Sequence, residues 1–206
     1  MVPWKKINRV FHKFFRGKEV VSSILSKEEW DAQYESGSWD RLLASVQPNT
    51  EYIAEYCLGL SKKLNRPISV VDLGCGNGSL GASFIKVNVP ISSYFGVDIS
   101  ETALVTAKES FPQGEYRCVD LSKEIPKEVK SADIVICNEV IYYVPITSFL
   151  KRLKEIYSGD IVFSYYESWR SFFIWIHIRL CFGKIKRYGV ETESQKWSID
   201  IYEQGK

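Results

Sequence analysis

The segment from Val70 to Gly81 carries the clearest chemical signature in this chain of 206 residues. It reads Val-Val-Asp-Leu-Gly-Cys-Gly-Asn-Gly-Ser-Leu-Gly, so a β-branched run ends at a carboxylate, Asp72, and glycines follow. A glycine has no Cβ to keep a ligand away from the backbone, and glycine-rich turns between a strand and a helix bind nucleotides in many proteins. The segment therefore predicts a nucleotide-type pocket.

The glycine spacing alone leaves two ligands open. Gly76, Gly78 and Gly81 match Gly-x-Gly-x-x-Gly, the dinucleotide fingerprint that holds a pyrophosphate. Asp72 favours another ligand, because an anion beside the turn repels a pyrophosphate and attracts a cation. S-adenosylmethionine (SAM) carries both an ammonium and a sulfonium in its methionine part. We therefore expect SAM. A nicotinamide dinucleotide oxidoreductase is the alternative, and a non-catalytic scaffold with the same fold is a third reading.

Polar residues also follow the later predicted strands. Asp98 ends the second strand, where a carboxylate can accept hydrogen bonds from both hydroxyls of a ribose. Asp120 ends the third and is placed to meet an adenine amino group, and the fourth ends in Asn138 and Glu139. Because open α/β sheets bind ligands at the carboxyl edge of their strands, we expect these side chains to share one site.

Strands and helices alternate along the rest of the chain. The predicted strands are 68–71, 94–97, 115–119, 133–137 and 161–163, and the predicted helices are 49–64, 82–88, 101–110 and 146–157. Residues 183–190 and 196–202 are expected to form a final hairpin, since the second of them alternates apolar and polar residues.

The motif Asp72-Leu-Gly-Cys-Gly-Asn-Gly resembles the first motif of the class I SAM-dependent methyltransferases, and the likeness extends over residues 67–164. That resemblance implies an α/β fold: a Rossmann-like, seven-stranded, mostly parallel sheet with an antiparallel last strand and helices on both faces. SAM would be the cofactor and S-adenosylhomocysteine its product. The cofactor-binding residues implied are Tyr34, Trp39, Asp72, Gly74, Cys75, Gly76, Asn77, Asp98, Ile99, Asp120, Leu121 and Asn138.

An aromatic segment precedes the glycine motif. Its pattern, Trp-x-x-x-Tyr-x-x-Gly-x-Trp from Trp30 to Trp39, is similar to the entry segment of small bacterial methyltransferases that act on sugars and metabolites. There the segment roofs the SAM site, and an aromatic face suits a sulfonium. The other reading is an amphipathic helix packed into the core. We expect a lid, with Tyr34 and Trp39 as its contacts.

Catalysis is expected beside the fourth strand. Methyl transfer is an in-line displacement, so the protein aligns the partners and can remove a proton. Glu139 is the candidate base, while Tyr142 and Tyr143 either line the acceptor site or pack in the core. Tyr165, Tyr166 and Glu167 are further acceptor candidates. The acceptor is expected to be a small molecule or a glycan, such as a lipid-linked sugar, methylated on oxygen or nitrogen. No metal-ligand cluster stands out.

Composition sets the broad class. A net charge of +2 argues against a general nucleic-acid binder, and five scattered cysteines suggest reduced thiols in the cytoplasm. No apolar stretch reaches the ~20 residues that cross a bilayer, and no signal-peptide pattern is seen. We expect a methyltransferase domain over residues 49–206, preceded by an arm and lid over residues 1–48. Nothing in the pattern fixes the oligomeric state.

Two segments suggest a membrane surface. Residues 1–20 hold six basic residues and one acid, and their Trp and Phe side chains fall on the opposite side of a helix from the Lys and Arg. Residues 169–182 are apolar almost throughout and are read as a helix. We expect contact with the inner face of an anionic membrane. The alternatives are that the first segment packs on the domain or on a second subunit, and that the second is a core helix.

Overall fold

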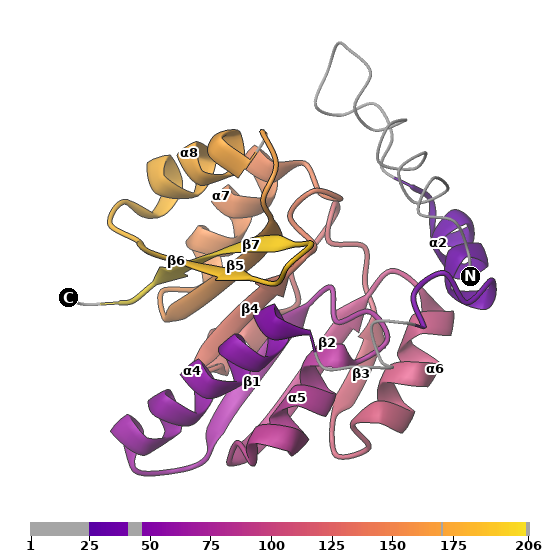
Figure 1. Ribbon diagram of the computed structural model, residues 1–206, viewed down its shortest axis with the longest axis horizontal. Coiled ribbons are helices and arrows are strands. Elements are labelled where there is room, and N and C mark those ends of the chain that lie inside the picture. Colours follow the sequence, from indigo (N-terminus) through magenta and orange to yellow (C-terminus); the bar gives the residue numbers. More distant parts are fainter. Residues whose placement is uncertain (1–24, 41–46, 170, 205–206) are drawn as a thin grey trace.

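A computed structural model describes residues 25–40, 47–169 and 171–204. Within them, seven strands form one sheet in the order β3-β2-β1-β4-β5-β7-β6 (Figure 1). The strands are β1 (Ile68–Leu73), β2 (Ile91–Asp98), β3 (Glu115–Cys118), β4 (Ile134–Asn138), β5 (Asp160–Tyr166), β6 (Lys186–Glu191) and β7 (Lys196–Tyr202). The first five run parallel, and β7 is antiparallel to both neighbours. The predicted fold class is confirmed.

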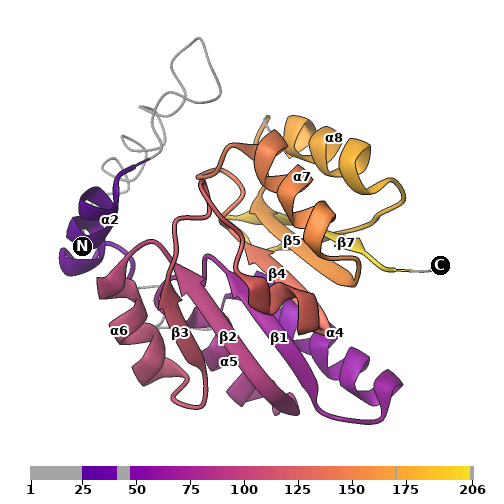
Figure 2. The same cartoon turned by 180° about the vertical axis from the view of Figure 1, so that it is seen from behind.

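Helices cover both faces of the sheet. One face carries α4 (Pro48–Leu64), α5 (Ser79–Val87) and α6 (Glu101–Ser110), which lie in front in Figure 1. The other carries the short 3-10 helix η1 (Lys127–Ser131), α7 (Ile146–Ile156) and α8 (Ser171–Phe182), and Figure 2 shows α7 and α8 from that side. Helix α2 (Lys27–Glu35) stands outside these layers, beside α6.

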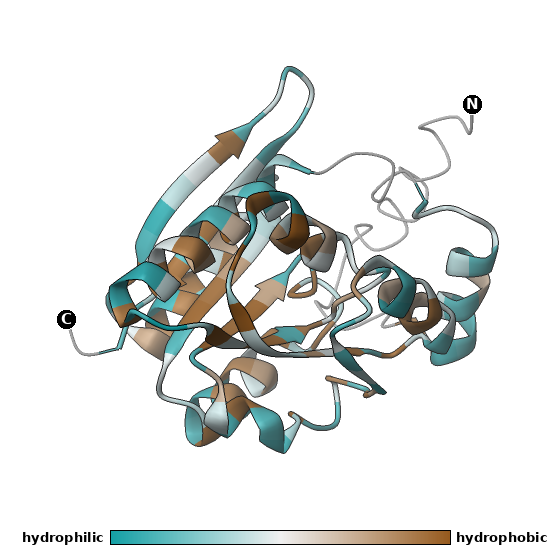
Figure 3. Cartoon of the chain, turned by 90° about the horizontal axis from the view of Figure 1, so that it is seen from below, coloured by the Kyte–Doolittle hydropathy of each residue, from teal (hydrophilic) through white to brown (hydrophobic). Residues whose placement is uncertain are grey.

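The strand sequences supply two apolar faces because neighbouring side chains of a strand point to opposite sides. In β4, Ile134 and Ile136 pack with the α4 and α5 side, whereas Val135 and Cys137 pack with the α7 and α8 side. All four are fully buried. Figure 3 shows the hydrophobic residues gathered on the central strands and on the helix sides that face them.

The strand order gathers the polar strand ends. The chain goes outward from β1 to β2 and β3, then returns to place β4 and β5 on the other side of β1. Such a reversal opens a crevice at the carboxyl edge of a parallel sheet. Asp98 ends β2 and Asn138 ends β4, so both lie at this edge.

Most predicted boundaries agree with the structure to within a few residues. Helix α6 begins after Ser100, as expected, and the Ser100 hydroxyl accepts a hydrogen bond from the Ala103 backbone N–H at 3.1 Å. Strand β5 is longer than predicted, since it continues from Phe163 to Tyr166. The basic segment over residues 1–20 lies outside the described residues.

Candidate active site

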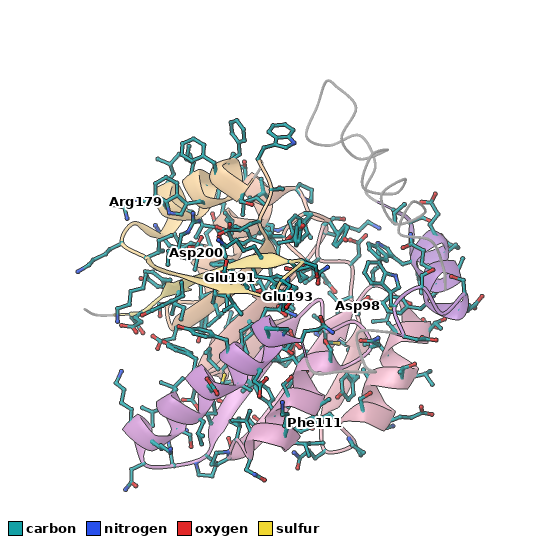
Figure 4. All side chains as sticks on the ribbon, in the orientation of Figure 1. Asp98, Phe111, Arg179, Glu191, Glu193 and Asp200 are labelled. Carbon is teal, nitrogen blue, oxygen red and sulfur yellow. The ribbon has the colours of Figure 1, made fainter. Side chains whose placement is uncertain are left out.

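A cavity of about 280 Å³ lies at the carboxyl edge of the sheet. Most of the residues singled out by sequence line it. They are Tyr34, Trp39, Gly74, Cys75, Gly76, Asn77, Asp98, Ile99, Asp120, Leu121, Asn138, Glu139 and Tyr143. Asp72 and Tyr142 are not part of this lining. Figure 4 labels Asp98 between the glycine turn and α2.

The glycines of the turn have different neighbours. At Gly76, where φ is +53°, an added Cβ would lie 2.9 Å from the Tyr34 hydroxyl, so the lid rests directly on the turn. At Gly78, where φ is +87°, it would lie 2.8 Å from the Ala107 Cα, and at Gly81 it would lie 2.6 Å from the Phe111 Cβ. Gly78 and Gly81 are therefore required by close packing of α5 against α6 and by Phe111. The dinucleotide-like spacing arises from that packing.

Asp98 orders the turn from the neighbouring strand. Its Oδ2 accepts a hydrogen bond from the Gly76 N–H at 2.9 Å, and its Oδ1 accepts one from the Ser100 N–H at 3.0 Å. Burial raises the pKa of Asp98, while these two N–H donors act against that rise. Each carboxylate oxygen has a second lone pair, so the group can still accept two hydroxyl donors from a ligand.

Asp120 and Asn138 stand on either side of the β1 end. Asp120 accepts hydrogen bonds from the Ser122 N–H and hydroxyl and pairs with Lys123 at 2.9 Å. Burial alone would raise the pKa of Asp120, but these partners outweigh it and the pKa is lowered, so the group is an anion. Asn138 Oδ1 accepts a hydrogen bond from Asn49 Nδ2 at 2.9 Å, which leaves the Asn138 amide donors for the cavity.

Asp72 is placed differently from the sequence expectation. Its side chain is buried, and Oδ2 accepts a hydrogen bond from the Tyr94 hydroxyl at 2.7 Å. Burial raises the pKa of Asp72 to about 7, although the Tyr94 hydrogen bond acts in the opposite direction. Because this carboxylate lies outside the cavity lining, the structure does not favour direct contact with a ligand there. Its second oxygen, Oδ1, has no partner among the described residues.

Four aromatic rings form the roof. Trp30 lies 4.8 Å from Tyr143 in an edge-to-face contact, and its ring centroid is 6.0 Å from that of Trp39 and 6.4 Å from that of Tyr34. Trp30 itself is buried. All four rings line the cavity. The aromatic segment from Trp30 to Trp39 therefore packs against the domain and also faces the cavity.

Polar contacts hold this roof in place. In α2, Asp31 Oδ1 accepts hydrogen bonds from the Ser100 hydroxyl at 2.6 Å and from the Thr102 N–H at 3.2 Å. Asn77 Nδ2 donates to the Trp39 carbonyl at 3.0 Å. The lid is therefore tied to the start of α6 and to the glycine turn.

Glu139 has the most unusual environment in the site. It follows β4 with φ at +58°, a left-handed conformation that non-glycine residues adopt mainly under constraint, often at functional sites. Burial raises the pKa of Glu139 to about 8, against the opposing effect of the Tyr142 hydrogen bond. The Tyr142 hydroxyl lies 3.4 Å from both carboxylate oxygens and accepts from the Tyr166 N–H. Tyr142 thus orients Glu139 from outside the lining, whereas Tyr143 faces the cavity.

Several lining residues were missed by sequence reasoning. They come from the start of α4 and from the β6–β7 hairpin: Gln47, Asn49, Thr50, Gln195 and Trp197. Asn49 opens the predicted helix over residues 49–64, to which no motif assigns a role in the site. Of the acceptor candidates, Tyr166 lines the cavity, while Glu167 accepts a hydrogen bond from the Ser198 hydroxyl at 2.9 Å. Tyr165 is fully buried against Asp200 and Arg187.

Residues 71–158 match a family model described as a methyltransferase domain. The chain is 31% identical to the ubiquinone biosynthesis O-methyltransferase of Nitrosomonas europaea over 128 residues, which are 60% of this chain and 49% of that protein. It is 32% identical to the trans-aconitate 2-methyltransferase of Variovorax paradoxus over 76 residues, 37% of this chain and 29% of that protein. The chain thus spans about half or less of these relatives.

Solved structures share the fold. The magnesium protoporphyrin IX methyltransferase of Synechocystis, solved with bound SAM, superposes with a TM-score of 0.58 at 16% identity, covering 98% of this chain and 92% of that one. Over residues 71–158 the chain is therefore similar to methyltransferase domains, its fold is shared with class I SAM-dependent methyltransferases, and these similarities support SAM as its cofactor.

The donors and acceptors of the cavity fit that cofactor. Asp98 can accept from a ribose, Asp120 and Leu121 can meet an adenine, and the Gly74–Asn77 turn can hold the methionine part. Two buried polar atoms of the lining, Trp39 Nε1 and Asn49 Oδ1, have no hydrogen-bond partner among the described residues. Buried polar groups are nearly always paired in folded proteins, so these two indicate a polar ligand.

Proposed function

We propose that the protein transfers a methyl group from SAM to an oxygen or nitrogen of a small-molecule or glycan acceptor. The observation that carries this proposal is that one roofed cavity joins Asp98 and the glycine turn to Glu139. The first two are suited to the cofactor and the third to proton transfer. The names of the relatives support the reaction class, and the O-methyltransferase among them favours oxygen over nitrogen.

Bound SAM supplies the electrophilic methyl group and the leaving group. The chain then has three tasks. Asp98 and the Gly74–Asn77 turn fix the nucleoside and methionine ends, and the rings of Tyr34 and Trp39 exclude water while facing a cationic sulfur. Asn138 donates from the β4 end. Alignment of this kind can supply much of the rate enhancement of a displacement reaction.

Glu139 removes the acceptor proton. With its pKa raised to about 8, the carboxylate is a stronger base than a solvent-exposed glutamate, and about a tenth of it is ionised at pH 7. Tyr142 holds it through its hydroxyl. The acceptor occupies the end of the cavity that Tyr143, Tyr166 and Trp197 line.

Calorimetry tests the cofactor assignment. We expect S-adenosylhomocysteine to bind and NAD to give no heat. Asp98→Ala should lose S-adenosylhomocysteine binding while keeping the circular dichroism spectrum. Binding of NAD alone, or unchanged affinity in Asp98→Ala, would overturn the proposal. Transfer itself is tested with methyl-labelled SAM and a panel of phenols, carboxylic acids, sugars and lipid-linked sugars, with label recovered in an acceptor as the expected result.

We further propose that residues 1–48 act as an arm and lid on the domain at 49–206, and that the protein works at the inner face of an anionic membrane. The basic, aromatic composition of residues 1–20 supports the second point. Deleting residues 2–17 should weaken co-sedimentation with anionic vesicles. If the full chain does not pellet and the deletion has no effect, the arm has no such role.

A further inference from the structure

Large apolar side chains are exposed on one helix of the described fold. Trp169 is 71% exposed, Phe172 57%, Phe173 53% and Leu180 81%. We call these four residues the α8 surface. The other exposed large apolar residues are spread over α4, α5, α6 and β6: Leu64, Ile85, Val105 and Tyr188. A contiguous exposed apolar patch on a soluble domain commonly marks an interaction site.

The spacing of the α8 surface puts its members on one side of the helix. At about 100° of rotation per helical residue, positions 172, 173 and 180 fall within roughly one quadrant of α8, and Trp169 just before the helix contacts Phe173. Rings touch along it: Trp169 with Phe173 at 6.2 Å and Phe172 with Phe173 at 6.0 Å. The opposite side, Ile174, Ile178 and Phe182, is buried in the core. The helix therefore already fills its place in the fold, and the α8 surface is additional apolar area.

Two exposed cations lie next to this surface. Residues 169–190 contain five Lys or Arg and no Asp or Glu, and of these Lys186 pairs with Glu203 and Arg187 with Asp200. Arg179 is exposed at the outer end of α8 and extends away from the domain in Figure 4, and Lys184 is exposed just beyond it. Neither forms an ion pair with a described residue. An apolar strip with unneutralised cations at its edge matches an anionic lipid interface.

We propose that the α8 surface docks into the headgroup region of an anionic lipid bilayer, with the helix lying in the plane of the interface. A helix of 12 residues is about 18 Å long, and no helix in the described part of the chain is long and apolar enough to cross a membrane. A second copy of the chain fits the α8 surface less well than a bilayer does. A two-fold interface over the α8 surface would bring the exposed Arg179 and Lys184 towards their own counterparts.

The position of the surface matters for the site. Tyr166, which lines the cavity, lies three residues before Trp169, so α8 starts beside the acceptor end. Docking would turn that end toward the lipid. If the proposed methyl transfer is correct, the acceptor is then a membrane-embedded or membrane-delivered molecule. The docking itself does not depend on the reaction.

Vesicle co-sedimentation of the full chain tests the docking. Wild type should pellet with phosphatidylglycerol-containing vesicles and much less with pure phosphatidylcholine. Phe172→Ser/Phe173→Ser should weaken the partition onto anionic vesicles by about tenfold or more, because buried apolar area drives interfacial binding. Ile85→Ser/Val105→Ser removes two comparably exposed apolar side chains from α5 and α6, and it should bind as wild type.

Calorimetry with S-adenosylhomocysteine on the same variants separates this inference from the function. Unchanged S-adenosylhomocysteine affinity with lost vesicle binding is the expected result and also shows that the variant is folded. Wild type that does not pellet, or a Phe172→Ser/Phe173→Ser protein that pellets fully, would overturn the docking. So would a wild-type dimer in light scattering that this variant converts to a monomer. Vesicle binding without S-adenosylhomocysteine binding would leave the docking intact and remove the proposed reaction.

Discussion

Glu139 combines backbone strain, burial and access to the cavity in one residue. A left-handed glutamate persists only where its surroundings fix it, and here the Tyr142 hydroxyl and the Glu139 N–H bond to the Ser164 carbonyl do so. Its raised pKa means that the folded protein binds this proton more tightly than the unfolded chain does. The stability that this contributes is present at acid pH and is lost as the pH rises through about 8.

Glu139→Gln should therefore stabilise the protein at alkaline pH. At pH 9 we expect the free energy of unfolding to exceed that of wild type by on the order of 2 kcal/mol, with the difference vanishing in acid. Urea unfolding across this pH range measures it. Glu109→Gln, exposed on α6, controls for loss of a negative charge. A pH-independent difference would contradict the burial of the Glu139 carboxylate.

The same substitution tests the proposed base. Methyl transfer should fall by about 10²–10⁴-fold with S-adenosylhomocysteine affinity unchanged. The wild-type rate should rise with pH and level off above about 8, the pKa of Glu139, because only the ionised carboxylate accepts a proton. If Glu139→Gln keeps the wild-type rate and pH profile, another group moves the proton or none is needed.

Asn49 is a second residue whose contacts point to a ligand. It is 3% exposed, donates to Asn138 and leaves its Oδ1 unpaired at the cavity. Asn49→Ala should weaken S-adenosylhomocysteine binding about fivefold, since about 1 kcal/mol is typical for a hydrogen bond. Calorimetry measures this, with Glu55→Ala on the exposed side of α4 as control. Equal affinity in both variants would remove Asn49 from the binding site.

Sequence reasoning found the residues next to a glycine turn or at a strand end, because these positions carry local signals. Asn49 gave none. A polar residue in the first turn of a helix is ordinarily a capping feature, and only the packing of α4 beside β4 brings it to Asn138. Asp72 does carry such a signal, yet the structure buries its side chain against Tyr94, and a carboxylate at a strand end looks the same in sequence whether it faces a ligand or a buried tyrosine.

At the scale of elements, α2 carries Trp30 and Tyr34 over the cavity and forms part of its roof. It is joined to the domain by few contacts, among which Asp31 makes hydrogen bonds to both Ser100 and Thr102. Its Lys27 pairs with Asp31 at 3.1 Å and with Glu101 at 3.6 Å. These contacts to the rest of the domain go to the start of α6 and not to the sheet, so a single substitution can loosen the roof and leave the sheet intact.

Asp31→Ala should raise the dissociation constant of S-adenosylhomocysteine by about tenfold, because two hydrogen bonds that close the roof are lost. Hydrogen exchange in residues 27–35 should speed up while exchange in β1 and β4 stays as in wild type. Glu28→Ala, on the exposed side of α2, is the matched control. Unaltered exchange in α2 would show that Asp31 does not hold the roof.

The sequence predicted α8 as a helix but left open which way it faces. Its residues are apolar on nearly every side, so periodicity carries no directional information. The structure resolves this by burying the side with Ile174 and Ile178 and exposing the α8 surface. By contrast, α6 had a cap, a polar side and a following turn, and its boundaries were predicted to the residue.

At the scale of the molecule, the β6–β7 hairpin completes both the sheet and the cavity. Asp200 in β7 is fully buried, and Arg187 of β6 binds it through Nε at 2.7 Å and Nη2 at 2.8 Å. The Tyr165 hydroxyl of β5 donates to the same carboxylate. The Asp200 carboxylate thereby links the three adjacent strands β5, β7 and β6.

Arg187→Met should lower the free energy of unfolding by about 3 kcal/mol, because it leaves the buried Asp200 carboxylate without its cation. Arg187→Met/Asp200→Leu should recover much of that loss, since an apolar pair needs no partner. Denaturant unfolding measures both. A double variant no more stable than the single one would show that the strands depend on the charge pair itself.

Ser100 connects Asp98, the residue suited to the ribose of the cofactor, to helix α2 of the roof. Its N–H binds Asp98 and its hydroxyl binds Asp31, so one residue touches both the floor and the cover of the cavity. Under the proposed reaction, a roof that opens to release S-adenosylhomocysteine would break the contact between Ser100 and Asp31. Each catalytic cycle then includes an opening whose speed caps turnover, and a slow exit would make the enzyme sensitive to accumulation of its own by-product.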